Sequence, residues 1–199
     1  MTVATTKRLT FEEYLSYEDG TDTRYELAKG ALVEMSLGTG KHGKITKFLD
    51  ERFNREIEHL GQAWTAERFT VGIQSPRGNR WDTCRIPDIT ILTIEQWDDM
   101  ESREAVIRAH EPPPLLVVEV VSPSTINADY REKRAEYMVL DIPEYWIVDP
   151  LEQKITVCIL QDGAYDDQAF QGEETPLSPT FPDFSLTVQQ ILEAKRSKT

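Results

Sequence analysis

The sequence predicts an α/β (α+β) fold in which a mixed central β-sheet is flanked by helices. Strand-length apolar runs alternate with amphipathic segments along the chain, which is typical of that class. The apolar run at 115–121 passes through a Ser-Pro-Ser-Thr turn into an amphipathic stretch at 126–140, as a buried strand feeding a helix does. Near the C-terminus, Asp162-Gly163 separates two strand-like runs and indicates an additional β-hairpin.

Length, charge and hydropathy limit the class of protein. The 199 residues suit one domain spanning 1–199. No apolar run has membrane-spanning length and the polar start lacks the apolar core of a signal peptide, so we expect a cytoplasmic protein without a membrane partner. Cys84 and Cys158 are far apart in the sequence and are expected to be reduced. The formal net charge of −13 argues by itself against nucleic-acid binding.

The elements follow in order from local patterns. A threonine marks the start of each short terminal helix, with acids in the first turn of the helix after Thr10, and Gly-rich or Pro-rich stretches mark the turns. Pro87 is acceptable at the start of a strand, where no ladder donor is needed. We expect a helix at 10–19, strands at 24–29 and 31–35 joined at Lys29-Gly30, a helix at 42–60, strands at 62–74 and 85–93 around a loop at 76–82, a short helix and a stiff exposed connection within 94–114, a strand at 143–149, hairpin strands at 154–160 and 164–170, and a terminal helix capped by Thr187.

Two charged residues stand where burial is expected. Glu119 shares a strand face with Val117 and Val121, and a buried unpaired carboxylate is too costly to keep. It must have a raised pKa, pair with a cation or bind a metal. Lys133 is the single charge in an inward helical stripe with Tyr130 and Tyr137. A salt bridge between Glu119 and Lys133, or a helical pair of Lys133 with Asp129, explains them equally well.

Three further residues extend the pattern. Asp88 lies at the mouth of a hydrophobic strand, Glu26 lies on an early strand, and His42 lies near the buried side of the long helix. A solvent-facing glutamate and a core histidine are the plainer interpretations of the last two. Two carboxylates from neighbouring strand ends are what Mg²⁺ needs, however, and a lysine beside them orients a water or offsets charge on a phosphate. The set indicates metal-assisted phosphodiester hydrolysis.

The sequence also resembles the Uma-two family of restriction-type endonucleases, within the PD-(D/E)XK nuclease superfamily. The resemblance covers about residues 8 to 192, with several motifs in order. The matching segments are RYEL at 24–27, KHG at 41–43, IPDITIL at 86–92, LLVVEVVSPST at 115–125, DYREKRAEY at 129–137 and PEYWIVDP at 143–150.

The resemblance implies a restriction-endonuclease-like core with a divalent cation, Mg²⁺ or Mn²⁺. Asp88, Glu119 and the backbone carbonyl of Val120 would be its ligands. The superfamily lysine is expected two residues after the acid, where this chain has Val121, so Lys133 is taken as its replacement. Glu26 matches an additional acid of some members and would hold a second cation or accept a proton. His42 matches a recurring histidine of unassigned role and is kept as an accessory residue.

The expected activity is metal-dependent endonucleolytic hydrolysis of DNA. A catalytically inactive nuclease-fold module for binding or assembly, and a metal-dependent hydrolase of smaller phosphoesters, are the alternatives. Solvated surface charge is the plainer interpretation of the basic residues outside this set, although each could contact a phosphate: Lys41, Lys44 and Lys47 on the long helix, and Arg77, Arg80 and Arg85 in the loop around Trp81. The aromatic content and the C-terminal hairpin favour a homodimer.

Overall fold

The structure is a computed structural model that describes residues 8–35 and 38–195, so the ends of the expected domain and residues 36–37 lie outside the described residues. Within those ranges, no helix combines the length and the hydropathy that crossing a bilayer requires. In chain order the elements are α1 (Phe11–Leu15), β1 (Tyr25–Ala28), β2 (Ala31–Glu34), α2 (Gly40–Leu60), β3 (Trp64–Arg68), β4 (Gly72–Arg77), β5 (Arg80–Arg85), β6 (Ile89–Thr93), α3 (Ile94–Asp99), β7 (Val106–Ile107), β8 (Leu116–Val120), η1 (Ala128–Lys133), α4 (Arg134–Val139), β9 (Glu144–Asp149), β10 (Lys154–Gln161), β11 (Ala164–Gln171) and α5 (Val188–Glu193).

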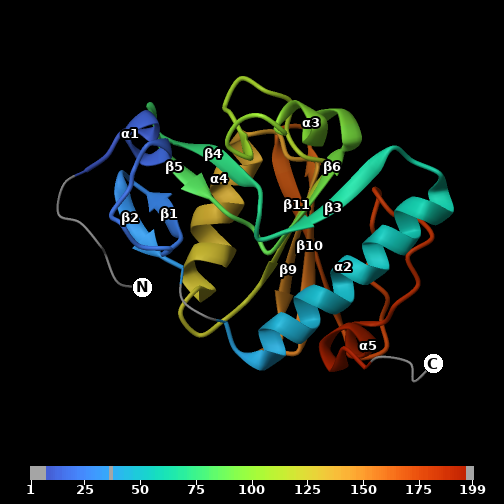
Figure 1. Cartoon of the computed structure of the whole chain (residues 1–199). Coiled ribbons are helices and arrows are strands. Elements are labelled where there is room, and N and C mark those ends of the chain that lie inside the picture. The colour runs from blue at the N-terminus through green and yellow to red at the C-terminus, as the bar shows by residue number, and fades with distance from the viewer. Residues whose placement is uncertain (1–7, 36–37, 196–199) are drawn as a thin grey trace.

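The described strands form two mixed sheets (Figure 1). The larger has the order β11-β10-β9-β8-β6-β3, with β8 and β9 parallel and the other neighbours antiparallel. The smaller has the order β2-β1-β5-β4-β7, with only β4 and β7 parallel. The mixed α+β class expected from the sequence is confirmed, and its strands are divided between two sheets.

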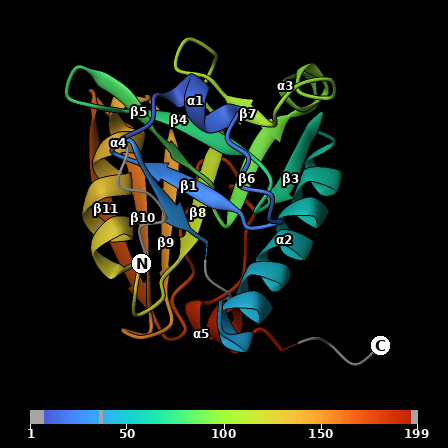
Figure 2. The same cartoon turned by 60° about the vertical axis from the view of Figure 1, so that its left-hand side comes forward.

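The six-stranded sheet separates two hydrophobic clusters. Leu116, Val118 and Val120 of β8 pack with α2 and α5 on one face. Val117 and Val121 pack with Tyr137 of α4 on the other face. Figure 2 shows α2 and α4 on opposite sides of the large sheet. Because side chains alternate along a strand, Glu119 points to the α4 side, as the sequence pattern predicted.

Two expected strands are each broken in the structure. The stretch 62–74 divides into β3 and β4, because Phe69 takes a left-handed conformation (φ 53°) and redirects the chain between the sheets. The stretch 85–93 is likewise interrupted at 86–88, so that β5 belongs to the small sheet and β6 to the large one. The expected loop at 76–82 is instead largely the β4–β5 hairpin. The apolar pattern of the sequence continues through both interruptions and therefore did not predict them.

The predicted turns and caps are confirmed. Lys29-Gly30 and Asp162-Gly163 both have positive φ, as two-residue hairpin turns require. Thr10 and Thr187 each form a capping box at their helix start. The helix after Thr10 ends at Leu15, earlier than expected. The C-terminal hairpin does not stand apart, since β10 pairs with β9 and extends the large sheet.

The helix expected at 126–140 has an unexpected start. Residues 128–133 form the π-helix η1, whose i→i+5 hydrogen bonds make a wider turn than those of an α-helix. The inward stripe therefore changes: Ile126 is 44% exposed, whereas Asp129 is buried. Lys133 and Tyr137 face inward as predicted.

Arg85 joins the small sheet to this helix. Its guanidinium is buried and donates to Glu136 through Nε (2.8 Å) and Nη2 (2.9 Å). Further contacts reach Glu132 (3.2 Å) and Glu26 (3.4 Å). The sequence suggested a loop position for Arg85, either solvated or in contact with a phosphate. Both interpretations are wrong, because β5 buries the side chain among three carboxylates.

Replacing Arg85 by methionine should destabilise the fold by about 3–5 kcal/mol, because Glu136 would stay buried without its cation. Arg80→Met is the matched control on the same strand. The Arg80 side chain is 66% exposed, so its replacement should change the free energy of unfolding by no more than about 0.5 kcal/mol. Urea unfolding of both variants measures the difference, and equal midpoints would contradict a structural role for the Arg85 network.

Candidate active site

The residues singled out from the sequence line one cavity of about 690 Å³. It is formed where β1, the start of α2, the connection before β6, the end of β8 and η1 meet. Those residues are Glu26, His42, Asp88, Glu119, Val120 and Lys133. A second hollow of about 530 Å³ is lined by Lys41 and Lys44, together with residues of α5, and contains none of them.

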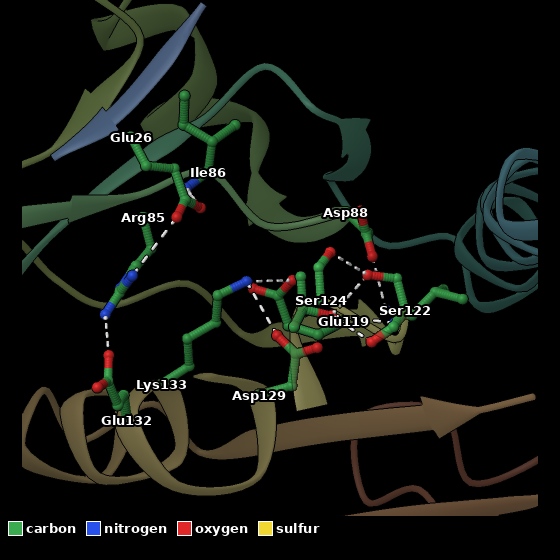
Figure 3. Close-up of polar contacts among 12 residues, drawn as sticks. Glu26, Arg85, Ile86, Asp88, Glu119, Ser122, Ser124, Asp129, Glu132 and Lys133 are labelled. Atoms are coloured by element: carbon green, nitrogen blue, oxygen red, sulfur yellow. Dashed lines mark hydrogen bonds and ion pairs between the residues drawn. The ribbon is translucent and has the colours of Figure 1, made fainter. Parts of the chain in front are cut away.

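Lys133 is shared by two buried carboxylates. Its Nζ lies 2.7 Å from Glu119 Oε2 and 3.1 Å from Asp129 Oδ1. The other oxygen of Glu119 accepts a hydrogen bond from the Tyr137 hydroxyl at 2.9 Å. Figure 3 shows the Lys133 ammonium meeting both carboxylates. The two pairings that the sequence offered as alternatives therefore occur together.

Asp88 is fixed through one oxygen. Its Oδ2 accepts the backbone N–H of Val120 at 2.6 Å and lies 3.1 Å from His42 Nε2. No contact to Oδ1 is formed within residues 8–35 and 38–195, which leaves that oxygen for a ligand in the cavity. His42 is thus neither an isolated core residue nor a solvated one, since it orients the Asp88 carboxylate.

Glu26 points into the fold. Its Oε1 accepts the backbone N–H of Ile86 at 3.0 Å, and its Oε2 lies 3.4 Å from Arg85 Nη1. The plain interpretation as a solvent-facing strand residue is wrong, because the side chain is only 12% exposed. Both oxygens already have partners, and the Ile86 contact fixes the segment that leads to Asp88.

The cavity has more buried negative than positive charge. Burial raises the pKa of Glu119 well above its ordinary value. Lys133 opposes the rise, and Asp129 and Asp88 add to it. Burial likewise raises the pKa of Asp129 against the opposing effect of Lys133. Burial alone would lower the pKa of Lys133, but Glu119, Glu26 and Asp129 raise it overall, so the ammonium keeps its charge.

The pKa of His42 is also affected by the acids of the cavity. Burial lowers the pKa of the imidazole, but a hydrogen bond and charge interaction with Asp88, the charge of Asp129 and the backbone of Val120 together raise it overall. The ring contacts Asp88, one of the three ligands expected for a cation, at the oxygen that also accepts the Val120 N–H.

These features fit a hard divalent cation. Both oxygens of Asp129 are buried without a well-aligned hydrogen bond among the described residues, although Oδ1 is within ion-pair distance of Lys133. In that same part of the chain, no group of three or more His, Cys, Asp or Glu side chains has the arrangement of a metal site. Mg²⁺ commonly uses one or two carboxylates and completes its shell with waters and substrate phosphate. The donor set agrees with that manner of binding.

Asp129 is the residue whose place in the cavity sequence reasoning missed. It was considered only as a helical partner of Lys133, four residues earlier. The D-x-x-x-K spacing was the available signal, because residues four apart lie on the same face of a helix. Serines and a threonine of the turn after β8 also line the cavity: Ser122, Ser124 and Thr125.

Comparisons with known proteins identify the family of this chain. The Uma2 family model, described as "Putative restriction endonuclease", matches residues 11–189. The chain belongs to the Uma2 (Uma-two) family. This confirms the family expected from the sequence motifs.

One protein sequence and one crystal structure are similar to this Uma2 chain. An uncharacterised protein of Synechocystis sp. is 25% identical over 150 residues, which are 75% of this chain and 79% of that protein. A crystal structure from Anabaena variabilis, described as a putative nuclease belonging to DUF820, superposes with a TM-score of 0.74 at 17% identity. The superposition covers 94% of this chain and 98% of that one, and it shows a common fold.

Lys133→Met should make the stability of the protein strongly pH-dependent. Without the ammonium, the pKa values of Glu119 and Asp129 in the folded state would rise further above their unfolded values. A raised folded-state pKa means that the folded chain binds these protons more tightly, so stability is kept in acid and lost as the pH rises through the folded-state pKa. We expect the free energy of unfolding of Lys133→Met to be lower than that of the wild type by about 3–5 kcal/mol near pH 8 and by less near pH 5.

Denaturant unfolding at both pH values tests this, with the exposed Lys44→Met as control. A loss for Lys133→Met that is the same in acid and base would contradict the charge balance described for the cavity.

Proposed function

We propose that this Uma2 chain is a Mg²⁺-dependent endonuclease that hydrolyses DNA phosphodiester bonds, with Mn²⁺ as a substitute. The observation that carries the proposal is the surplus of buried carboxylate in a cavity that opens to solvent. Here one ammonium faces two acids, and a bound cation would balance the remaining negative charge. The family and the fold, both described as those of nucleases, support the same activity.

In this proposal Asp88, Glu119 and the backbone carbonyl of Val120 hold the cation. A bound Mg²⁺ would polarise the scissile phosphate and lower the pKa of a water. Asp88 has one oxygen free for this role because its other oxygen is held by the Val120 N–H and His42. His42 is then a positioning residue for Asp88.

Lys133 is the proposed catalytic cation. Its Nζ lies at the cavity wall, where it can hold the attacking water and offset the negative charge that develops on the phosphate. Asp129 would anchor the ammonium from the helix side. Glu26 would act as a positioning residue through Ile86.

One observation favours an inactive binding or assembly module. Lys133 is engaged by two carboxylates, and the chain carries a formal net charge of −13 that opposes approach to DNA. In this alternative the same residues form a structural ion network. Hydrolysis of a small phosphodiester without cleavage of DNA would instead favour a hydrolase of smaller phosphoesters.

Plasmid cleavage separates these possibilities. The wild type should nick or linearise plasmid DNA with Mg²⁺ or Mn²⁺ and not with EDTA. Asp88→Asn and Glu119→Gln should each lower the rate about a hundredfold or more, since each removes a cation ligand. Asp98→Asn and Glu95→Gln are matched controls, because both side chains are exposed on α3 and outside the cavity.

Circular dichroism establishes that each variant is folded. Failure of the wild type to cleave with either metal, or full activity in both cavity variants, would contradict the proposal.

A further inference from the structure

We propose that Arg24 and Ser124 make up a phosphate-binding subsite of the catalytic cavity, in which each side chain contacts phosphate oxygens of the DNA strand. This inference rests on the proposed function, because it names residues that bind the substrate of that site. Both residues line the cavity that contains Asp88, Glu119 and Lys133. Neither is among the residues that the sequence predicted for the site.

The charge of the cavity wall requires such a subsite. The acids that line it are Asp22, Glu26, Glu34, Asp88, Glu119 and Asp129, whereas the basic side chains are Arg24, Lys133 and His42. Lys133 already pairs with two carboxylates, and His42 is engaged with Asp88. A phosphodiester entering this cavity would meet repulsion from the wall unless other donors accept its oxygens. Of the described basic side chains in the lining, this leaves Arg24.

Arg24 has unused donors. It is exposed and has no carboxylate within ion-pair distance among residues 8–35 and 38–195. Its Nη2 donates to the backbone carbonyl of Phe69, which fixes the guanidinium in place. The remaining N–H groups are therefore available to a ligand. A guanidinium suits this purpose, since its planar set of donors matches phosphate oxygens.

Ser124 supplies a neutral donor. The turn after β8 is closed by Thr125, whose Oγ1 accepts the Ser122 N–H at 3.0 Å and donates to the Ser122 carbonyl at 3.3 Å. Ser122 Oγ lies 3.1 Å from both Thr125 Oγ1 and Ser124 Oγ. Each hydroxyl has one proton, so a relay from Ser122 to Ser124 leaves the Ser124 proton free to point outward. An anionic oxygen in the cavity favours that direction.

The Ser124 hydroxyl is not needed to hold the turn together. Its hydroxyl contacts only Ser122 Oγ among the described residues, and the side chain is exposed. Alanine at this position should leave the turn intact, because Thr125 still closes it. Ser124→Ala therefore tests binding without a change in folding.

Binding of a fluorescein-labelled single-stranded oligonucleotide, measured by anisotropy in EDTA at several salt concentrations, tests the proposal without any cleavage. Arg24→Gln should weaken binding about tenfold. It should also lower the slope of log Kd against log salt by about 0.7, the value for one phosphate contact. Ser124→Ala should weaken binding about threefold without a change of slope, because it removes a neutral donor.

Arg55→Gln and Ser102→Ala are matched controls. Both native side chains are exposed and lie outside the cavity, so their loss should leave affinity and slope unchanged. Equal affinities for Arg24→Gln, Ser124→Ala and the controls would overturn the subsite, as would absence of binding by the wild type. If the wild type binds with the expected dependence on Arg24 but does not cleave plasmid DNA, the subsite stands and the catalytic proposal fails.

Discussion

One ammonium shared by two buried carboxylates is the interaction on which the site depends. Lys133 lies at 2.7 Å from Glu119 and 3.1 Å from Asp129, and all three side chains are removed from bulk water. This arrangement leaves one negative charge without a partner in the protein interior, where an unpaired charge destabilises the fold. The pKa of Glu119 is raised for the same reason, because burial and its acidic neighbours disfavour the ionised carboxylate. A divalent cation in the adjoining cavity would reduce that destabilisation.

The rest of the fold keeps this imbalance in place. The small sheet contributes Glu26 and Arg85, and Arg85 ties that sheet to Glu132 and Glu136 on either side of Lys133. Glu26 also holds the Ile86 N–H, two residues before Asp88. The long helix α2 supplies His42, which orients Asp88. Asp88, Glu119 and Glu26 thus each have two contacts that fix the carboxylate, as a preorganised site requires.

Sequence reasoning recovered those parts of the site that follow from local periodicity. Alternation placed Glu119 on the α4 face, and helical spacing placed Lys133 and Tyr137 inward. Asp129 and Arg85 were missed or misplaced for a physical reason. Asp129 was treated only as a helical partner of Lys133, and the burial of Arg85 depends on carboxylates that are distant in the sequence. The division of 62–74 and 85–93 between two sheets depends on tertiary pairing, which apolar patterning does not report.

The central claim is that the surplus of buried carboxylate makes the cavity a cation site. Isothermal titration of Mn²⁺ into the wild-type protein, with Glu119→Gln and Asp98→Asn titrated in parallel, tests it most directly. We expect one ion per chain, bound at least about tenfold more weakly by Glu119→Gln and unchanged by the exposed Asp98→Asn. Absence of binding by the wild type, or equal affinity in Glu119→Gln, would contradict the account.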